Sequence, residues 1–241
     1  MTLLPETLCH LNGQTLPLRD AKVSVLDRGF IFGDGIYEVI PVYNRRLFSF
    51  DEHMARMQRN LGKLRIPNPH TREAWLALVR ELVAAQPAED QLVYIEITRG
   101  VALRDHVMPE GLTPTVFVMT SAMKPPSVEM RHHGVACITA RDFRWERGDI
   151  KSISLLGNVL ARQMSADHGA AETILFRDGW LTEAAASNVW VCTRVRCSAR
   201  PRATMCSKAS ATTCWPSCAR RSASPTTCAR SPRPTCWPPT R

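Results

Sequence analysis

A single lysine stands between an acidic loop and an apolar run in the stretch RGDIKSISLLGN, residues 147–158. Burying an ammonium group is costly, so Lys151 has two interpretations. The side chain can extend its charge to the surface at the start of a helix. Alternatively, a desolvated lysine loses its proton easily, and its neutral amine becomes a nucleophile for carbonyl groups. The rest of the chain has to decide between a surface lysine and a reactive one.

Four other side chains are of types that handle anions and protons. Glu183 stands near the end of an alternating run, where a solvated acid is the simpler interpretation. Arg56 lies in a helical pattern that places it on the polar face. Arg104 and His106 are two positions apart, and alternate residues of an extended segment point the same way. The two can therefore reach one anion, although a charged surface loop is the alternative.

The elements that position these residues follow from the hydrophobic pattern. Residues 22–50 predict three strands joined by turns, with a hairpin at "NRR". Residues 50–66 predict a helix, because apolar residues recur on one face and Asp51 can cap its start. That face consists of Met54, Met57, Leu61 and Leu64.

A second helix is predicted over residues 71–87, where Pro87 stops it. Residues 91–100 and 114–122 alternate as strands. We therefore expect an N-terminal α/β domain over residues 1–122.

Residues 123–130, MKPPSVEM, indicate a linker, because two prolines favour an extended connection. After it, residues 134–145 predict a strand and residues 154–170 a helix. Residues 171–191 predict two strands around the "RDG" turn. We expect a second domain to begin here and to occupy residues 131–192.

Residues 193–241 have a different composition. They hold ten basic residues and no acidic one, so the net charge of +9 is concentrated there and residues 1–192 are close to neutral. Six of the nine cysteines and seven prolines also fall in this tail, which has no Leu, Ile, Phe or Tyr. Such a segment cannot bury enough apolar surface to offset the entropy of ordering it.

Three explanations of the tail compete. A basic disordered arm would bind nucleic acid. A metal or disulfide module is disfavoured, because Cys214 and Cys218 are the one close pair and no histidine follows His168. The third is translation of a shifted reading frame, since suitable codons in the next frame give an amphipathic, acidic string with a Gly-Ile turn. We favour the frameshift. We therefore expect a disordered tail and no nucleic-acid partner.

The remaining composition excludes a membrane protein. No apolar run approaches the roughly 18 residues that span a bilayer. The start, MTLLPETLCHLNG, lacks a basic region and carries Glu6, unlike a signal peptide. We therefore expect a cytoplasmic globular protein with no membrane or metal partner.

Four motifs occur in order along the chain: DRGFIFGDGIYEV at 27–39, TRGVALRDHVMP at 98–109, DIKSISLLGNVLA at 149–161 and LTEAAASNVW at 181–190. Together they resemble the fold-type IV pyridoxal-phosphate enzymes, the class IV aminotransferases, across nearly all of residues 10–192. Within that family the likeness is greatest to bacterial D-amino-acid transaminases. The resemblance implies a two-domain α/β (α+β) fold with a small N-terminal domain and a larger C-terminal domain.

The resemblance also implies roles for the candidate residues. Lys151 would hold pyridoxal 5'-phosphate as a Schiff base and then shuttle the proton of the substrate α-carbon. Glu183 would face the pyridine nitrogen and keep the ring protonated. Arg56 would bind the phosphate through its bidentate fork. Ser187 and Asn188 would complete the cofactor contacts.

The family's carboxylate trap matches Tyr37, Arg104 and His106. In the family the arginine and histidine come from the partner subunit, so the resemblance implies a homodimer. The implied reaction moves the amino group of a D-amino acid such as D-alanine to a 2-oxo acid. Branched-chain transaminases and aminodeoxychorismate lyases share the lysine and glutamate but generally lack "RDH", and they stay the alternatives within the family.

Two departures from the family pattern weigh against activity. Residues 184–186 are alanines where the family often has Gly and serines. The printed tail also lacks the Gly-Ile-Thr turn of the family's phosphate cup. We therefore expect poor folding and weak cofactor retention, and an inactive fragment is a further alternative.

Overall fold

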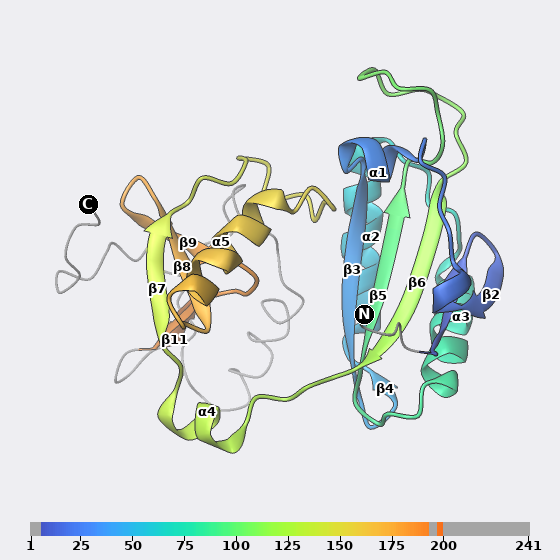
Figure 1. Ribbon diagram of the computed structural model, residues 1–241. Helices are drawn as coiled ribbons and strands as arrows, with labels where there is room; N and C mark the ends of the chain where they lie inside the picture. The colour runs from blue at the N-terminus through green and yellow to red at the C-terminus, as the bar shows by residue number, and fades with distance from the viewer. Residues whose placement is uncertain (1–5, 193–196, 200–241) are drawn as a thin grey trace. The chain divides into compact units, whose positions relative to one another are not determined.

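The computed structural model describes residues 6–192 and 197–199 (Figure 1). These residues form two compact units. The first contains residues 6–125 and 150–154, and the second contains residues 126–149, 155–192 and 197–199. The short segment 150–154 thus belongs to the first unit although the second unit flanks it in the sequence.

The first unit is built on a six-stranded sheet in the order β2-β1-β6-β5-β3-β4, in which every neighbouring pair is antiparallel. Hairpins join β1 to β2 and β3 to β4, and a longer connection joins β5 to β6, whereas the connection from β4 to β5 skips the intervening β3. The strands are β1 (Leu8–Leu11), β2 (Gln14–Pro17), β3 (Gly35–Tyr43), β4 (Arg46–Leu47), β5 (Gln91–Thr98) and β6 (Thr115–Ala122).

Two helices, α2 (Phe50–Leu64) and α3 (Arg72–Ala85), pack on this sheet (Figure 1). Their apolar faces meet alternate residues of the central strands and form the larger core of the chain. The face predicted for the first helix is confirmed, because Met54, Met57 and Leu61 are buried and Leu64 packs at the edge of the core. The buried members from the strands and from α3 include Ile36, Ile40, Ile95, Ile97, Val118, Trp75, Val79 and Leu82.

The predicted helix ends are partly correct. α3 ends at Ala85, shortly before Pro87, and begins after Thr71, whose Oγ1 accepts a hydrogen bond from the Ala74 amide at 3.2 Å. The prediction that Asp51 caps α2 is wrong. The helix starts after Ser49, so Asp51 already lies in the first turn, where its carboxylate accepts a hydrogen bond from Arg72 Nε at 2.7 Å.

The N-terminal strands also differ from the prediction. Residues 22–26 form no strand, and residues 28–32 form the short helix α1 (Arg28–Phe32). β1 and β2 lie earlier and are joined through Asn12 and Gly13, both at positive φ. Asn-Gly favours such a hairpin turn, so the signal was in the sequence and was overlooked. The hairpin predicted at "NRR" is confirmed, because Asn44 and Arg45, at φ 48° and 59°, join β3 to β4.

The second unit begins with a helix where an extended linker was expected. Residues 123–127 have no regular structure, but α4 (Val128–His133) starts inside the predicted linker. Ser127 explains the difference, because its Oγ accepts a hydrogen bond from the Met130 amide at 3.1 Å and caps the helix.

A three-stranded sheet in the order β7-β8-β9 forms the centre of the second unit. β7 and β8 are parallel and are connected through α5, which packs on both, whereas β8 and β9 are antiparallel. The predicted "RDG" turn joins β8 to β9, with Asp178 and Gly179 at positive φ. The elements are β7 (Cys137–Arg141), α5 (Leu156–Asp167), β8 (Glu172–Arg177), β9 (Trp180–Ala184), and the antiparallel pair β10 (Trp190–Cys192) and β11 (Cys197–Ala199).

Within the ranges that the structure describes, no helix is both long and apolar enough to cross a membrane. The prediction that residues 193–241 form a disordered, frameshifted tail falls outside the described residues, apart from β11.

Candidate active site

Lys151 is positioned by the first strand residues of β3. The Tyr37 amide donates to the Lys151 carbonyl at 3.0 Å, and the Ile153 amide donates to the Gly35 carbonyl at 3.2 Å. Residues 150–154 therefore lie along β3, and Ile150 is buried in the larger core. Gly35 permits this approach, because a Cβ there would lie 3.1 Å from Ile153 Cδ1.

The Lys151 side chain is half-buried, and its Nζ lies 3.9 Å from the centroid of the Tyr37 ring. An ammonium group over an aromatic face makes a favourable cation–π contact. α5 begins at Leu156, so Lys151 is not at a helix start, where a simple surface lysine was the alternative. The structure thus brings together two residues that the sequence selected from widely separated motifs.

Tyr94 and Glu96 of β5 form a polar pair beside Tyr37. The Tyr37 ring stacks on the Tyr94 ring with centroids 5.8 Å apart, and the Tyr94 hydroxyl donates to Glu96 Oε2 at 2.7 Å. Burial and the neighbouring Glu96 carboxylate both raise the pKa of Tyr94, so this residue stays a donor. Burial also raises the pKa of Glu96 despite the hydrogen bond from Tyr94.

Arg56 is buried, which corrects its assignment to the polar face of the helix. Its Nε donates to Glu38 Oε1 at 2.7 Å and its Nη2 to Glu38 Oε2 at 2.5 Å. His53 Nδ1 lies 2.8 Å from the same Oε2. Helical periodicity missed this, because the acid that makes burial tolerable stands on β3, next to Tyr37.

Glu38 is only 1% exposed, yet it is held as a carboxylate. Burial alone would raise its pKa, but the hydrogen bonds and charges of Arg56 and His53 outweigh burial and lower the pKa below its ordinary value. The fork of two hydrogen bonds fixes the plane of the guanidinium. Among the described residues, the buried Nε2 of His53 has no hydrogen-bond partner.

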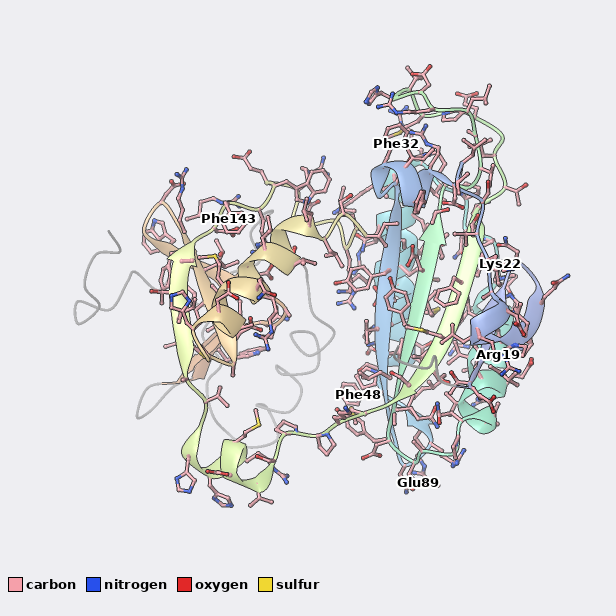
Figure 2. All side chains as sticks on the ribbon, viewed as in Figure 1. Arg19, Lys22, Phe32, Phe48, Glu89 and Phe143 are labelled. Atoms are coloured by element: carbon pink, nitrogen blue, oxygen red, sulfur yellow. The ribbon has the colours of Figure 1, made fainter. Side chains whose placement is uncertain are left out.

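Arg104 and His106 lie in the exposed connection between β5 and β6, which extends past the end of the sheet beside α1 (Figure 1). Both side chains meet Phe32, the residue labelled at this end of the sheet in Figure 2. Arg104 Cζ is 5.5 Å and the His106 ring centroid 5.3 Å from the centroid of the Phe32 ring. Arg28 anchors the connection by donating from Nη1 to the Asp105 carbonyl at 2.6 Å.

Within the described part of this chain, no contact joins Arg104 or His106 to Tyr37 or Lys151. The structure therefore gathers the predicted substrate residues into two places of the first unit. One is the start of β3, and the other is the end of α1.

Glu183 lies in β9 of the second unit, and its side chain is 13% exposed. Arg144 Nη1 donates to Glu183 Oε1 at 2.6 Å. The other edge of the same guanidinium donates from Nε and Nη2 to the two oxygens of Asp142, each at 3.0 Å. Arg177 Nη2 lies 3.3 Å from Asp142 Oδ1. Two carboxylates and two guanidinium groups thus form one buried cluster.

Asp142 and Arg144 stabilise each other's charged form. Burial raises the pKa of Asp142, but hydrogen bonding to Arg144 and its charge lower the pKa further, to below the ordinary value. Burial lowers the pKa of Arg144, and the two carboxylates more than reverse this effect. Asp142 and Arg144 are therefore both charged at neutral pH.

Ser187 and Asn188 follow β9 in an exposed loop. Ser187 Oγ donates to Glu172 Oε2 at 3.1 Å, and its carbonyl accepts the Ala184 amide at 2.9 Å. Ala184 and Ala185 are buried, and Ala185 belongs to the core of the second unit. These two alanines, which stand where the family often has small polar residues, therefore pack rather than face solvent.

Sequence reasoning missed the partners of the candidate residues. Glu38 is an acid inside an otherwise apolar strand, and Asp142 and Arg144 stand together in "RDFRW". An ionisable residue in an apolar stretch is a usable signal, since it needs a partner when buried. Among the described residues, no group of three or more His, Cys, Asp or Glu side chains could hold a metal ion.

The first unit offers an amine on an aromatic face and a buried guanidinium, and the second unit offers a carboxylate held in a charged cluster. Residues 35–225 match the family described as amino-transferase class IV, and the chain belongs to this family. The resemblance seen in the four motifs is confirmed.

Individual relatives place the chain more closely. It is 41% identical over 180 residues to a D-alanine aminotransferase of Bacillus licheniformis, a match that covers 75% of this chain and 63% of the relative. The chain thus spans less than two thirds of that relative's length.

Solved structures confirm the mixed α/β fold. A branched-chain amino acid aminotransferase from Escherichia coli has a TM-score of 0.81 at 17% identity, covering 95% of this chain and 78% of that one. A fold IV-transaminase of Curtobacterium pusillum has a TM-score of 0.78 at 20% identity, covering 91% and 77%. At these identities the likeness shows the fold alone.

Proposed function

We propose that the chain is a pyridoxal-phosphate-dependent aminotransferase that moves the amino group of a D-amino acid, such as D-alanine, to a 2-oxo acid. The observation that carries this proposal is the position of Lys151 on the Tyr37 ring in a chain 41% identical to a D-alanine aminotransferase. We also propose the domain division drawn from the sequence, with the connection between the units at residues 123–127, and a cytoplasmic location.

The residues present fit the chemistry of this cofactor. An aldehyde needs an amine, and Lys151 presents one from a backbone that is fixed against β3. A phosphate needs an oriented cation, and Glu38 holds the Arg56 guanidinium in one plane. A pyridine nitrogen needs a carboxylate, and Glu183 is held by Arg144. Ser187 and Asn188 add polar groups in the loop after β9.

When bound, the cofactor supplies a carbonyl carbon for attachment and an electron-withdrawing ring for loss of the substrate α-proton. Lys151 would hold the cofactor and then take and return that proton at Nζ. Glu183 would accept a hydrogen bond from the ring nitrogen, and Arg56 would bind the phosphate. Tyr37 borders the amine and would limit how the substrate lies beside it.

The substrate carboxylate would be bound by Arg104 and His106 of a partner subunit, so we propose a homodimer. Support comes from the apolar surface around these residues in the first unit. Leu103 is 83% exposed, and Phe30 and Val107 are each 71% exposed. Apolar side chains clustered in this way mark an interaction surface. Sedimentation of the full chain should give a dimer, which Leu103→Ser should weaken.

The test of the proposed chemistry uses the full chain incubated with pyridoxal phosphate. We expect a visible absorption band, and borohydride should attach the cofactor permanently to Lys151. Lys151→Ala should lose both signals. The control is Lys22→Ala, which removes an exposed lysine of the same unit (Figure 2). A folded chain that stays colourless and is not labelled at Lys151 would contradict the proposal.

A coupled assay with D-alanine and 2-oxoglutarate tests the substrate. Activity with branched-chain L-amino acids instead would favour the branched-chain alternative. The same assay on a chain translated in the alternative reading frame after residue 192 shows whether the tail or the site causes a loss of activity. Activity that returns in that chain assigns the loss to the tail. The nucleotide sequence around codons 188–200 tests the frameshift directly.

A further inference from the structure

Arg144 is the centre of the buried charged cluster of the second unit. Its side chain is 9% exposed and connects two carboxylates that are far apart in the sequence, Asp142 and Glu183. The contact with Glu183 Oε1, at 2.6 Å, is at the short end for a charge-assisted hydrogen bond. Arg144 therefore acts directly on the carboxylate that the proposed function assigns to the cofactor ring.

Several groups fix the position of Arg144. Asp142 receives hydrogen bonds from the Arg144 amide, Nε and Nη2. The Arg144 carbonyl accepts a hydrogen bond from Arg177 Nη2 at 2.7 Å. Gly157 of α5 leaves room for the side chain, because a Cβ at that position would lie 3.1 Å from Arg144 Cγ. Asp142 thus holds the guanidinium, Arg177 of β8 holds the Arg144 backbone, and Gly157 of α5 leaves space beside the side chain.

Among the described residues, the charged side chains of this cluster lie on two neighbouring strands or beside them. Asp142 and Arg144 follow β7, and Arg177 ends β8. On α5, Arg162 and Asp167 bond to side chains of the same helix. Arg144 contacts Glu183 directly, at 2.6 Å.

We propose that Arg144 is a positioning residue that fixes the orientation of the Glu183 carboxylate toward the cofactor ring. The inference rests on the proposed function, in which Glu183 meets the ring nitrogen. A guanidinium can only donate hydrogen bonds, so its short contact with Oε1 restrains the carboxylate. Without Arg144, the Glu183 side chain loses this restraint and accepts a hydrogen bond from the ring less well.

The test measures the pyridoxal phosphate affinity of the full chain by absorbance and by fluorescence quenching. Arg144→Met should weaken binding about tenfold or more, as expected when one charge-assisted hydrogen bond is lost. Arg144→Lys keeps the charge and should recover part of the affinity. Arg147→Met, in the same loop but with an exposed side chain, is the control and should bind normally.

A second background separates positioning from a merely structural role. In a Glu183→Gln chain, Arg144→Met should cause little further loss of affinity, because the residue it acts on has already lost its charge. An equal loss of affinity in both backgrounds, or no loss in Arg144→Met, would overturn the proposal. If Arg144→Met does not fold, Arg144→Lys is compared in the same two backgrounds, because it keeps the charge but loses the pair of hydrogen bonds from the guanidinium to Asp142.

Failure of this inference differs from failure of the proposed function. If the proposed function is wrong, the unchanged chain itself is not labelled at Lys151. If only the inference is wrong, the unchanged chain is still labelled at Lys151, and Arg144→Met either binds the cofactor as tightly as the unchanged chain or loses as much affinity in the Glu183→Gln background as alone.

Discussion

Each unit buries an arginine, but the two arginines have different surroundings. In the first unit Arg56 binds one carboxylate, Glu38, beside a core to which β3, β5, β6, α2 and α3 all contribute. In the second unit Arg144 connects two carboxylates, Asp142 and Glu183, and the described core consists of four small or medium-sized side chains.

The difference shows two ways of holding a charged site in place. A large apolar core supplies stability through burial. An ion pair inside such a core mainly ensures that neither charge is buried without a partner. In the described part of the second unit, Asp142, Arg177 and Glu183 belong to the regions of three neighbouring strands. Their charges therefore help to define how those strands meet. Variants that disrupt the two arrangements should therefore lose stability in different ways.

The largest effect is expected for Glu38→Ala, which removes the carboxylate that the buried Arg56 and His53 side chains both contact. We expect a loss of about 3–5 kcal/mol in the free energy of unfolding, measured by urea denaturation. Glu89→Ala is the matched control, because its ion pair with Arg45 is exposed and should contribute no more than about 1 kcal/mol (Figure 2). Equal losses in the two variants would contradict this view of the first unit.

The two apolar cores can be compared with Ile97→Ala and Leu175→Ala, both fully buried positions. Large-to-small changes of this kind cost about 2–5 kcal/mol. Ile97 is surrounded by the larger core, so its replacement should lie toward the upper end of that range, and Leu175→Ala toward the lower end. Calorimetry of both variants measures the difference, and the reverse order would mean that the second unit has the more tightly packed core.

The charged cluster of the second unit predicts an acid-sensitive transition. The native pKa of Asp142 lies below its ordinary value, because contacts with Arg144 outweigh burial. Its stabilisation is therefore present above the ordinary pKa and is lost as the pH falls through the lowered native value. Asp142→Asn should cost about 1–3 kcal/mol at neutral pH and flatten the acid side of the stability profile.

The measurement is thermal unfolding of both chains at a series of pH values. If Asp142→Asn loses stability in acid as steeply as the unchanged chain, another group causes the acid sensitivity. Asp34 and Glu38 of the first unit also have lowered pKa values, so the signal has to be assigned to the second unit with a probe in that unit.

The smallest effects are expected at the helix caps. Thr71→Ala removes the cap of α3, whose buried face includes Trp75, and should cost about 1 kcal/mol. Ser127→Ala removes the cap of α4, which buries none of its residues, and should cost less than about 0.5 kcal/mol. Urea denaturation of the two variants measures both values. A larger loss for Ser127→Ala would show that α4 contributes more to the second unit than its exposure indicates.

The sequence predicted much of the fold, because the relevant signals are local. The apolar stripe of α2 and the turns at Asn44 and Asp178 act over a few residues. Two of the differences from the prediction follow from local signals, the Asn-Gly turn at Asn12 and the cap at Ser127, whereas the burial of Arg56 depends on Glu38 of another element. The roles assigned to Lys151 and the other site residues came from motif order, and they stay predictions.

By itself, the sequence determined the family, the two amphipathic helices of the first unit and the identity of the reactive lysine that we propose. Only the tertiary structure decided which charges are buried together. Arg56 lies 18 positions from Glu38, and Arg144 lies 39 positions from Glu183. Partners at such distances are set by which strands become neighbours and in what register, and no pattern within a single helix or strand carries that information.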